Sequence, residues 1–280
     1  MFQYCTDPSI LSQFKWFSCY LTSGKHISFY LSFLIVISLI CITAPISLFF
    51  GFCGSLASRS SFILLKYTGL LYTNIVRGIP DIVFFLFIPI TIDQILEYSR
   101  HKIMCPEITE SVWRGTDFLV CSAAKLPLNS DPQWIHSTYS FLLAILSFSI
   151  VFGAFASNTI SGAINAVPKS QIETARSFGM TNNQVYLKII IPQMWLYALP
   201  GLSNLWMLLI KSTPLLFLLG INDIVYWAKE IGGSKTSIFK YPHPDWRVWY
   251  FLGLLVFYLL VTKLSEIAFK KISNKINHAT

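Results

Sequence analysis

The run from Ile27 to Cys53 contains no charged side chain. A helix that crosses the hydrocarbon core of a bilayer needs about 20 mostly apolar residues, and this run exceeds that length. Charged residues make up only 12% of the 280-residue chain, whereas soluble globular domains carry roughly 25%. Because so little charge cannot cover a soluble surface, the sequence predicts an integral membrane protein and excludes a disordered chain.

Five apolar segments are long enough to cross a bilayer. They cover about residues 27–53, 62–95, 137–167, 189–221 and 248–268. The second is interrupted by Arg77-Gly-Ile-Pro-Asp81. We interpret this as a break within one span, because neither half alone reaches the length that a span needs. The sequence therefore predicts an all-α fold with five transmembrane helices.

Polar segments separate the predicted spans, the longest being the loops 97–136 and 222–247. Five spans place the two termini on opposite sides of the membrane. With Lys211 left out, ten Lys and Arg residues fall on each side, so the positive-inside rule does not decide the orientation. The net charge of +8 comes from cations that flank spans, without the basic stripe of a nucleic-acid-binding protein. We therefore expect a lipid bilayer, and no nucleic acid, as a partner.

The polar segment 168–188 carries signals for two short helices. Ser170 and Glu173 match an S-x-x-E capping box, and Thr181 and Gln184 match a T-x-x-Q box. Gly179 stands where the first helix needs a left-handed residue to end. The pattern predicts a helix, a turn at Gly179 and a second helix.

The first of these helices has an apolar stripe. Ile172, Ala175 and Phe178 recur at i, i+3 and i+6, so they share one helical face. Because a charged helix pair between two spans lies in water, the stripe needs a partner outside the membrane. The alternative is that the helix packs on loops of its own chain.

This segment resembles the cytoplasmic coupling loop of ABC importer permeases. The family pattern is Glu-Ala-Ala, three residues, Gly, nine residues, Ile, any residue and Leu-Pro. Its spacing is kept here by Glu173, Thr174, Ala175, Gly179, Ile189, Ile191 and Pro192. Thr174 and Ile191 replace the usual Ala and Leu. In the family this loop docks into a cleft of the ATP-hydrolysing subunit, and the resemblance implies that role here for residues 168–188, the coupling loop.

The resemblance covers about residues 27–268 and implies a type I ABC importer permease fold. Arg77-Gly-Ile-Pro resembles the R-G-x-P stretch of polar amino-acid permeases, and residues 198–233 resemble permeases for histidine, arginine, lysine and ornithine. A permease for basic amino acids is therefore implied, with glutamine or opines as the alternative substrates. Pro214 departs from the usual Ala, and the loop 97–136 matches no family feature.

The resemblance also implies partners and sidedness. A dimer of ATPase subunits would bind ATP, a periplasmic solute-binding protein would deliver the amino acid, and a second permease, identical or homologous, would complete the pathway. The chain itself needs no cofactor, since its nearest string to a P-loop, Gly233-Ser-Lys-Thr236, lacks the required glycines. In the bacterial inner membrane the coupling loop would be cytoplasmic. The N-terminal segment 1–26 would then be periplasmic and the tail 269–280 cytoplasmic.

Polar residues inside the predicted spans are candidates for the solute pathway or a gate. Lysine at the bilayer centre costs about 3 kcal/mol, so Lys211 should face an interior, a partner or a water-filled cavity, as a gate or as part of a structural pair. Arg77 and Asp81 flank the helix break, where freed backbone groups can line a path, although we favour a local i,i+4 ion pair. For Asn158 and Asn204 we favour hydrogen bonds between helices over contacts with solute.

Other classes of function find less support in the sequence. Cys105 and Cys121 share one loop, and both a disulfide and two free thiols are open to them. The histidines have no metal-ligand spacing, and no catalytic motif appears, so we expect neither a metal site nor an enzyme. An ion-coupled transporter would need acidic or histidine relays inside spans, to which only Asp81 and Asp93 come close.

Overall fold

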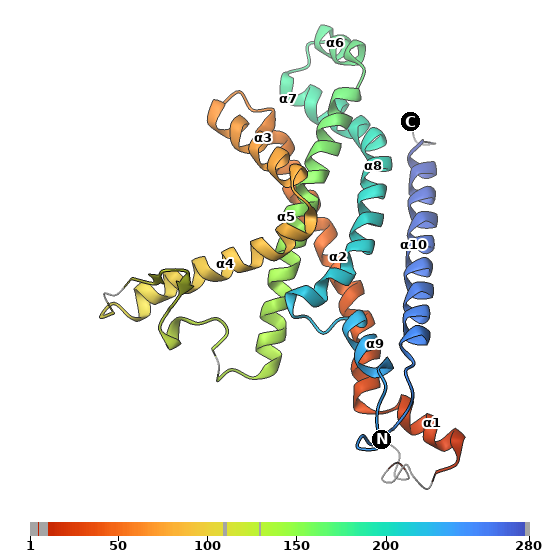
Figure 1. Cartoon of the computed structure of the whole chain (residues 1–280). Coiled ribbons are helices and arrows are strands. Elements are labelled where there is room, and N and C mark those ends of the chain that lie inside the picture. The colour runs from red at the N-terminus through yellow and green to blue at the C-terminus, as the bar shows by residue number, and fades with distance from the viewer. Residues whose placement is uncertain (1–4, 6–10, 109–110, 129, 278–280) are drawn as a thin grey trace. The chain divides into compact units, whose positions relative to one another are not determined.

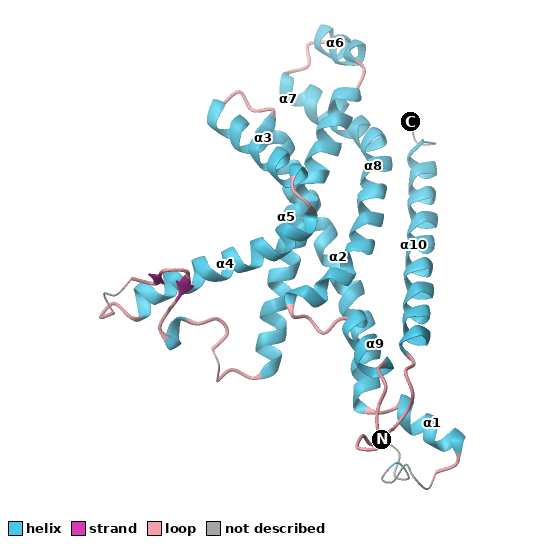
Figure 2. Cartoon of the chain, viewed as in Figure 1, coloured by secondary structure: helices cyan, strands magenta, loops and turns pink. Residues whose placement is uncertain are grey.

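The computed structural model describes residues 5, 11–108, 111–128 and 130–277, which are almost entirely helical outside the loops (Figure 2). The helices in chain order are α1 (Gln13–Leu21), α2 (Gly24–Ser58), α3 (Ile63–Gly78), α4 (Asp81–Met104), α5 (Gln133–Ala166), α6 (Lys169–Ser177), α7 (Asn182–Val185), α8 (Ile191–Ser212), α9 (Ile224–Gly232) and α10 (Arg247–Asn277). Three shorter turns are the 3₁₀ segments η3 (Ser122–Ala124) and η5 (Thr213–Leu219) and the π-helix η4 (Tyr186–Ile190).

Five helical segments of the described chain are long and apolar enough to cross a membrane, which confirms the predicted number. They are α2, α4, α5, the continuous run from α7 to η5, and α10. Their ends differ from the sequence prediction, because α4 continues to Met104 and α5 begins at Gln133. The predicted loop 97–136 is therefore shorter, and its ends belong to the two flanking helices.

The interpretation of 62–95 as one broken span is wrong. The structure has two helices there, α3 and α4, separated by Ile79 and Pro80. Ile79 is extended, with φ −116° and ψ 144°, because a residue that precedes proline is forced out of the helical region. Of the two helices, α4 meets the length and apolarity of a span.

The chain divides into two compact units. Unit 1 comprises residues 1–42, 163–217 and 222–280, and unit 2 comprises residues 43–162 and 218–221. Both α2 and α5 contribute residues to each unit.

In unit 2, α2 and α5 pack through small residues. A Cβ built on Gly51 would lie 2.7 Å from Cβ of Ala156, and one on Gly54 would lie 2.8 Å from Oγ of Ser157. Small residues at a crossing let the backbones of two membrane helices approach closely. Any larger side chain at either glycine would therefore push the two helices apart.

A disulfide-bonded loop follows α4 in unit 2. Cys105 and Cys121 are joined, and between them lies a hairpin of β1 (Trp113–Arg114) and β2 (Asp117–Phe118), which pair antiparallel. The loop is held against α4 because Arg100 donates to the carbonyl of Ala123 at 3.0 Å.

Unit 1 is built on α8, α9 and α10, with α10 packed against both α8 and α9. The T-shaped contact of Phe33 with Phe257, with ring centroids 4.7 Å apart, joins α10 to the first half of α2. Within this unit, α6 lies at the end of α8 near the C-terminal end of α10, and α1 lies at the opposite end of α10 (Figure 1). The coupling loop and α1 therefore occupy opposite ends of the same helix pair.

Candidate coupling loop and pathway residues

Helix α6 begins one residue after Pro168, which has φ −60° and ψ 126°. The predicted capping box at Ser170 and Glu173 is wrong, because Pro168 sets the start of the helix and Ser170 is already inside the first turn. The carbonyl of Ser170 accepts a hydrogen bond from the Thr174 hydroxyl at 2.8 Å. Glu173 consequently stays exposed, without a hydrogen bond or ion pair to any described residue.

The end of α6 is a Schellman turn. The amide of Gly179 donates to the carbonyl of Arg176 at 2.9 Å, and the amide of Met180 donates to that of Ala175 at 3.2 Å. Gly179 has φ +77°, a conformation that favours glycine. The predicted turn at Gly179 is confirmed.

The second predicted capping box is also confirmed. The amide of Gln184 donates to Oγ1 of Thr181 at 3.4 Å, and the amide of Thr181 donates to Oε1 of Gln184 at 2.9 Å. Helix α7 then continues through the π-helix η4 into α8. Ile189 lies in η4, and Pro192 lies in the first turn of α8, directly after this π-helix.

The apolar stripe of α6 is divided between the chain itself and solvent. Ala175 is buried, Ile172 is half-buried, and Phe178 is 82% exposed. Glu173 and Thr174 are exposed beside them. Helix α6 thus packs on its own chain through Ala175. Its other edge exposes Phe178 beside the charged Glu173 and the polar Thr174.

One side-chain hydrogen bond connects the coupling loop to the membrane-spanning part of unit 1. The amide nitrogen of Gln193, in the first turn of α8, donates to the side-chain oxygen of Gln171 in α6. Helix α6 also packs against α7 and η4. A displacement of α6 would therefore act directly on the start of α8.

Two polar residues of α8 lie on one exposed face of the helix. Asn204 and Lys211 are seven residues apart, which places them on the same side of the helix, and both are exposed together with Leu208. Neither Asn204 nor Lys211 has a hydrogen bond or ion pair to the described residues. The expectation of an interhelix hydrogen bond for Asn204 is wrong within this chain, because its side chain points away from it.

Asn158 is likewise exposed on α5 and has no hydrogen bond to a described residue, so its expected interhelix bond is also wrong. The local Arg77–Asp81 ion pair is absent from the described chain as well. Arg77 belongs to the last turn of α3 and Asp81 to the first turn of α4. Because Ile79 and Pro80 separate the two helices, the residues do not have the i,i+4 geometry of one helix.

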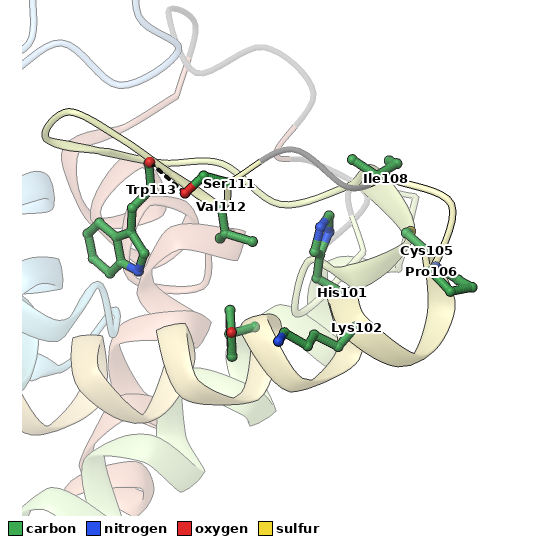
Figure 3. Close-up of a pocket in the computed structure, with 9 residues that line it drawn as sticks. His101, Lys102, Cys105, Pro106, Ile108, Ser111, Val112 and Trp113 are labelled. Carbon is green, nitrogen blue, oxygen red and sulfur yellow. Dashed lines mark hydrogen bonds between the residues drawn. The ribbon is translucent and has the colours of Figure 1, made fainter.

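His101, Cys105 and Cys121 place ligand atoms within 4.8 Å of one another. Both sulfurs belong to the disulfide, and Nδ1 of His101 accepts the amide of Cys121 at 3.0 Å. A pocket of about 530 Å³ opens beside this group (Figure 3). It is lined by His101 and Lys102 of α4 and by residues of the loop that follows, among them Ser111, Val112 and Trp113. All three ligand atoms are already engaged in this arrangement.

Sequence reasoning missed a second disulfide, between Cys5 and Cys19, and the aromatic cluster around it. Tyr20 and Tyr241 are buried in this cluster. The only sequence signal was a pair of cysteines in a segment rich in aromatic residues, and their pairing depends on contacts with the distant loop at Tyr241.

Sequence reasoning also missed Asp223, the N-cap of α9. Its Oδ1 accepts the amide of Tyr226 at 2.9 Å, while its Oδ2 is buried without a hydrogen-bond partner among the described residues. Burial raises the pKa of Asp223 to about 6, although the amides of Tyr226 and Val225 oppose the rise. An aspartate before a helix is a local sequence signal for a helix cap, but it does not indicate that the carboxylate is buried.

The fold and the coupling loop define a multi-pass membrane protein of the ABC permease class. Residues 51–278 match the family model of the binding-protein-dependent transport system inner membrane component. The chain belongs to this family.

Curated relatives in bacteria cover most of the chain. The histidine/lysine/arginine/ornithine transport system permease protein HisQ of Escherichia coli is 32% identical over 70% of this chain and 69% of its own length. The arginine ABC transporter permease protein ArtQ of E. coli is 28% identical over 74% and 77%. The octopine transport system permease protein OccQ of Rhizobium radiobacter is 28% identical over 80% of each chain.

Solved structures show the same fold. A crystal structure of an amino acid ABC transporter with histidines aligns with a TM-score of 0.59 at 20% identity, covering 90% of this chain and 98% of the other. The MetNI methionine ABC transporter, in an inward-facing conformation, aligns with a TM-score of 0.52 at 14% identity. The architecture is therefore that of a type I ABC importer permease.

Proposed function

We propose that this chain is a permease subunit of an ATP-driven importer for basic amino acids. Family membership supports the class of protein, and the coupling loop carries the proposed mechanism. Its Schellman turn at Gly179 and its capping box at Thr181 build a rigid, water-exposed helix pair at one end of a span. Such a pair is suited to transmitting a force into α8.

In this proposal the exposed edge of α6 docks into the ATPase subunit. Phe178, at 82% exposure, would fill an apolar part of the ATPase cleft. Glu173 would contribute a charged contact at the rim of this interface. Closure of the ATPase dimer on ATP would move α6, and the Gln171–Gln193 hydrogen bond would pass that movement to α8.

The solute pathway would form between this chain and a second permease subunit. The face of α8 that carries Asn204 and Lys211 is exposed in the single chain, and a lysine in a span is tolerated only beside a partner, an interior or water. A second permease facing α8 would provide that environment. Lys211 would then border the path and, being cationic, would repel a basic solute rather than bind it.

The substrate assignment follows the relatives, which are permeases for arginine, for histidine, lysine, arginine and ornithine, and for octopine. The side chains of arginine, lysine, ornithine and histidine are all basic, as a guanidinium, an ammonium or an imidazole. Uptake of labelled arginine into vesicles, competed by lysine, histidine, ornithine, octopine and glutamine, tests the assignment. Competition by glutamine alone would overturn it.

The proposed orientation places the coupling loop and the C-terminus in the cytoplasm, and α1 with the disulfide-bonded segments in the periplasm. The arrangement within unit 1 supports this, since α6 and the C-terminal end of α10 lie together and α1 lies at the other end (Figure 1). Disulfides persist in the oxidising periplasm, which also favours this side for Cys5, Cys19, Cys105 and Cys121.

The coupling role is tested by Glu173→Lys, with Glu266→Lys as the matched control. Both glutamates are exposed on helices of unit 1, and among the described residues Glu266 pairs only with its helical neighbour Lys263. We expect Glu173→Lys to abolish ATP-dependent uptake while the permease still assembles in the membrane, and Glu266→Lys to retain uptake. Normal uptake by Glu173→Lys would remove the coupling claim, and uptake by the wild-type complex without ATP would favour an ion-coupled transporter.

A further inference from the structure

Helix α1 is fastened to unit 1 by one face. Cys19 and Tyr20 are buried on this face, and Cys19 is joined to Cys5. The ring of Tyr20 lies 5.5 Å from that of Trp246 in a T-shaped contact, and its hydroxyl bonds Nε2 of His243 at 3.1 Å. These contacts hold α1 against the segment that leads into α10.

Two other aromatic side chains of α1 are exposed to the surroundings. Phe14 is 84% exposed and Phe17 is 49% exposed. In the first turn of α10, Val248 is 77% exposed and Trp249 is 70% exposed. Large apolar side chains are therefore exposed on α1, which lies outside the predicted spans, and on the first turn of α10, which belongs to the last span.

An apolar groove runs between these two helices. Its volume is about 410 Å³, and its lining consists of Phe17, Tyr20, Leu21, Trp246, Trp249 and Tyr250. Aromatic rings supply most of this lining, and the residues of α10 that contribute to it, Trp249 and Tyr250, are in its first turn.

The position of the groove identifies its surroundings. The helix α10, which is long and apolar enough to cross a membrane, begins at Arg247, so a groove lined by Trp249 and Tyr250 lies at the end of that helix, where a span would meet the headgroup region. Trp and Tyr concentrate at that depth because their rings are apolar and their N–H or O–H groups remain near water. Farther along α10 the exposed apolar surface continues without interruption through Leu252, Leu255, Val256 and Leu259.

We propose that α1 is an interfacial helix that lies in the headgroup region of the bilayer, and that the groove between α1 and α10 holds a phospholipid acyl chain. An interfacial helix places aromatic and apolar side chains toward the acyl chains and remains parallel to the membrane surface. Phospholipid is the occupant that the structure favours, because the groove opens onto the continuous apolar surface of a membrane span. The inference concerns the membrane contact of α1 and does not depend on the transported solute.

Photocrosslinking tests this contact in the intact protein. A benzophenone amino acid is placed at position 14 or 17 of the full chain, in membranes of cells that also make its ATPase, second permease and binding protein. Phe178 is the matched control position, because it is a phenylalanine of nearly the same exposure, 82% against 84% for Phe14, in the coupling loop. After irradiation, the purified permease is analysed by mass spectrometry for phospholipid adducts and by electrophoresis for protein adducts.

We expect phospholipid adducts at positions 14 and 17, several-fold above those at position 178. Adducts of positions 14 and 17 to the second permease or to the binding protein would overturn the proposal and identify this face as a protein interface. Lipid labelling at position 178 equal to that at positions 14 and 17 would also overturn it. These outcomes leave the transport assignment untouched, since none of them depends on uptake.

Discussion

The hydroxyl of Tyr20 lies 3.1 Å from Nε2 of His243, although 223 residues separate them in the chain. Nδ1 of His243 lies 2.7 Å from the carbonyl of Pro244, which can only accept, so Nδ1 carries a proton. The hydroxyl of Tyr250 donates to that of Tyr20 at 3.3 Å and lies 2.7 Å from Nε2 of His26. One chain of hydrogen bonds therefore joins the ends of α1, α2 and α10.

Tyr20→Phe should lower stability more than the removal of an exposed tyrosine hydroxyl. The change removes the buried hydroxyl that lies 3.1 Å from Nε2 of His243 and 3.2 Å from the carbonyl of Ile231. At least one of these groups then loses its hydrogen-bond partner, and an unsatisfied buried group costs about 1–3 kcal/mol. Tyr30→Phe is the control, since the Tyr30 hydroxyl donates to the carbonyl of Leu21 at an exposed site. Thermal unfolding of both variants in detergent measures the effect, and equal melting temperatures would contradict it.

Replacing Cys5 and Cys19 by serine should release α1. The disulfide closes a loop with a sequence separation of 14, and cross-links of this length contribute about 3 kcal/mol. Because α1 is a single short helix, we expect faster proteolysis near its start while the spans stay folded. The pair Cys105 and Cys121, with a separation of 16, is the control: its serine variant should expose the loop after α4 and leave the cleavage rate of α1 unchanged. Cleavage of α1 at the wild-type rate in the Cys5 and Cys19 variant would argue against this anchor.

Asp223 should make the permease less stable as pH rises from about 4 to about 6. Burial raises its pKa to about 6 from 3.8, so the folded state favours the protonated acid. The resulting penalty is absent below the unfolded pKa, grows as the carboxyl ionises, and is complete above the folded pKa. A difference of about two pKa units corresponds to about 3 kcal/mol.

Asp223→Asn tests this titration. The Asn side chain keeps an oxygen that can cap the amide of Tyr226 and has no charge to bury. We expect melting temperatures above those of the wild type at about pH 7.5, and no difference, or a small loss, near pH 4. A variant that is less stable than the wild type at both pH values would show that the carboxylate is paired in the folded protein.

The sequence predicted local features of the coupling loop better than contacts between distant segments. The turn at Gly179 and the cap at Thr181 depend on residues within five positions of each other, and both are present. The cap predicted at Ser170 failed because Pro168, two positions earlier, starts the helix. Local patterns therefore indicated the helices but not always their first residue.

Contacts across long sequence separations could not be predicted. The burial of Tyr20 depends on Tyr241 and Trp246, and no periodicity in residues 13–21 indicates these partners. For Asn204 the opposite applies: its apolar surroundings in sequence suggested a hydrogen bond between helices, whereas the structure leaves it exposed. Lys211, which was expected to face an interior, a partner or a water-filled cavity, is exposed in the single chain as well. Hydropathy identifies a membrane span but does not say which side of it faces lipid, another helix or a second subunit.

Gly179→Ala should weaken the coupling loop through its backbone alone. Gly179 has φ +77°, and a Cβ added there would meet nothing within 4 Å, so no side-chain clash contributes. The left-handed conformation costs a non-glycine residue about 1–2 kcal/mol. Gly162→Ala is the control, because Gly162 lies in α5, has the same open space and lacks a positive φ; there alanine should be neutral or stabilising by up to about 1 kcal/mol.

Hydrogen exchange of the Gly179 and Met180 amides, which close the turn, should quicken in Gly179→Ala and stay unchanged in Gly162→Ala. Unchanged exchange in both variants would mean that the turn does not depend on glycine.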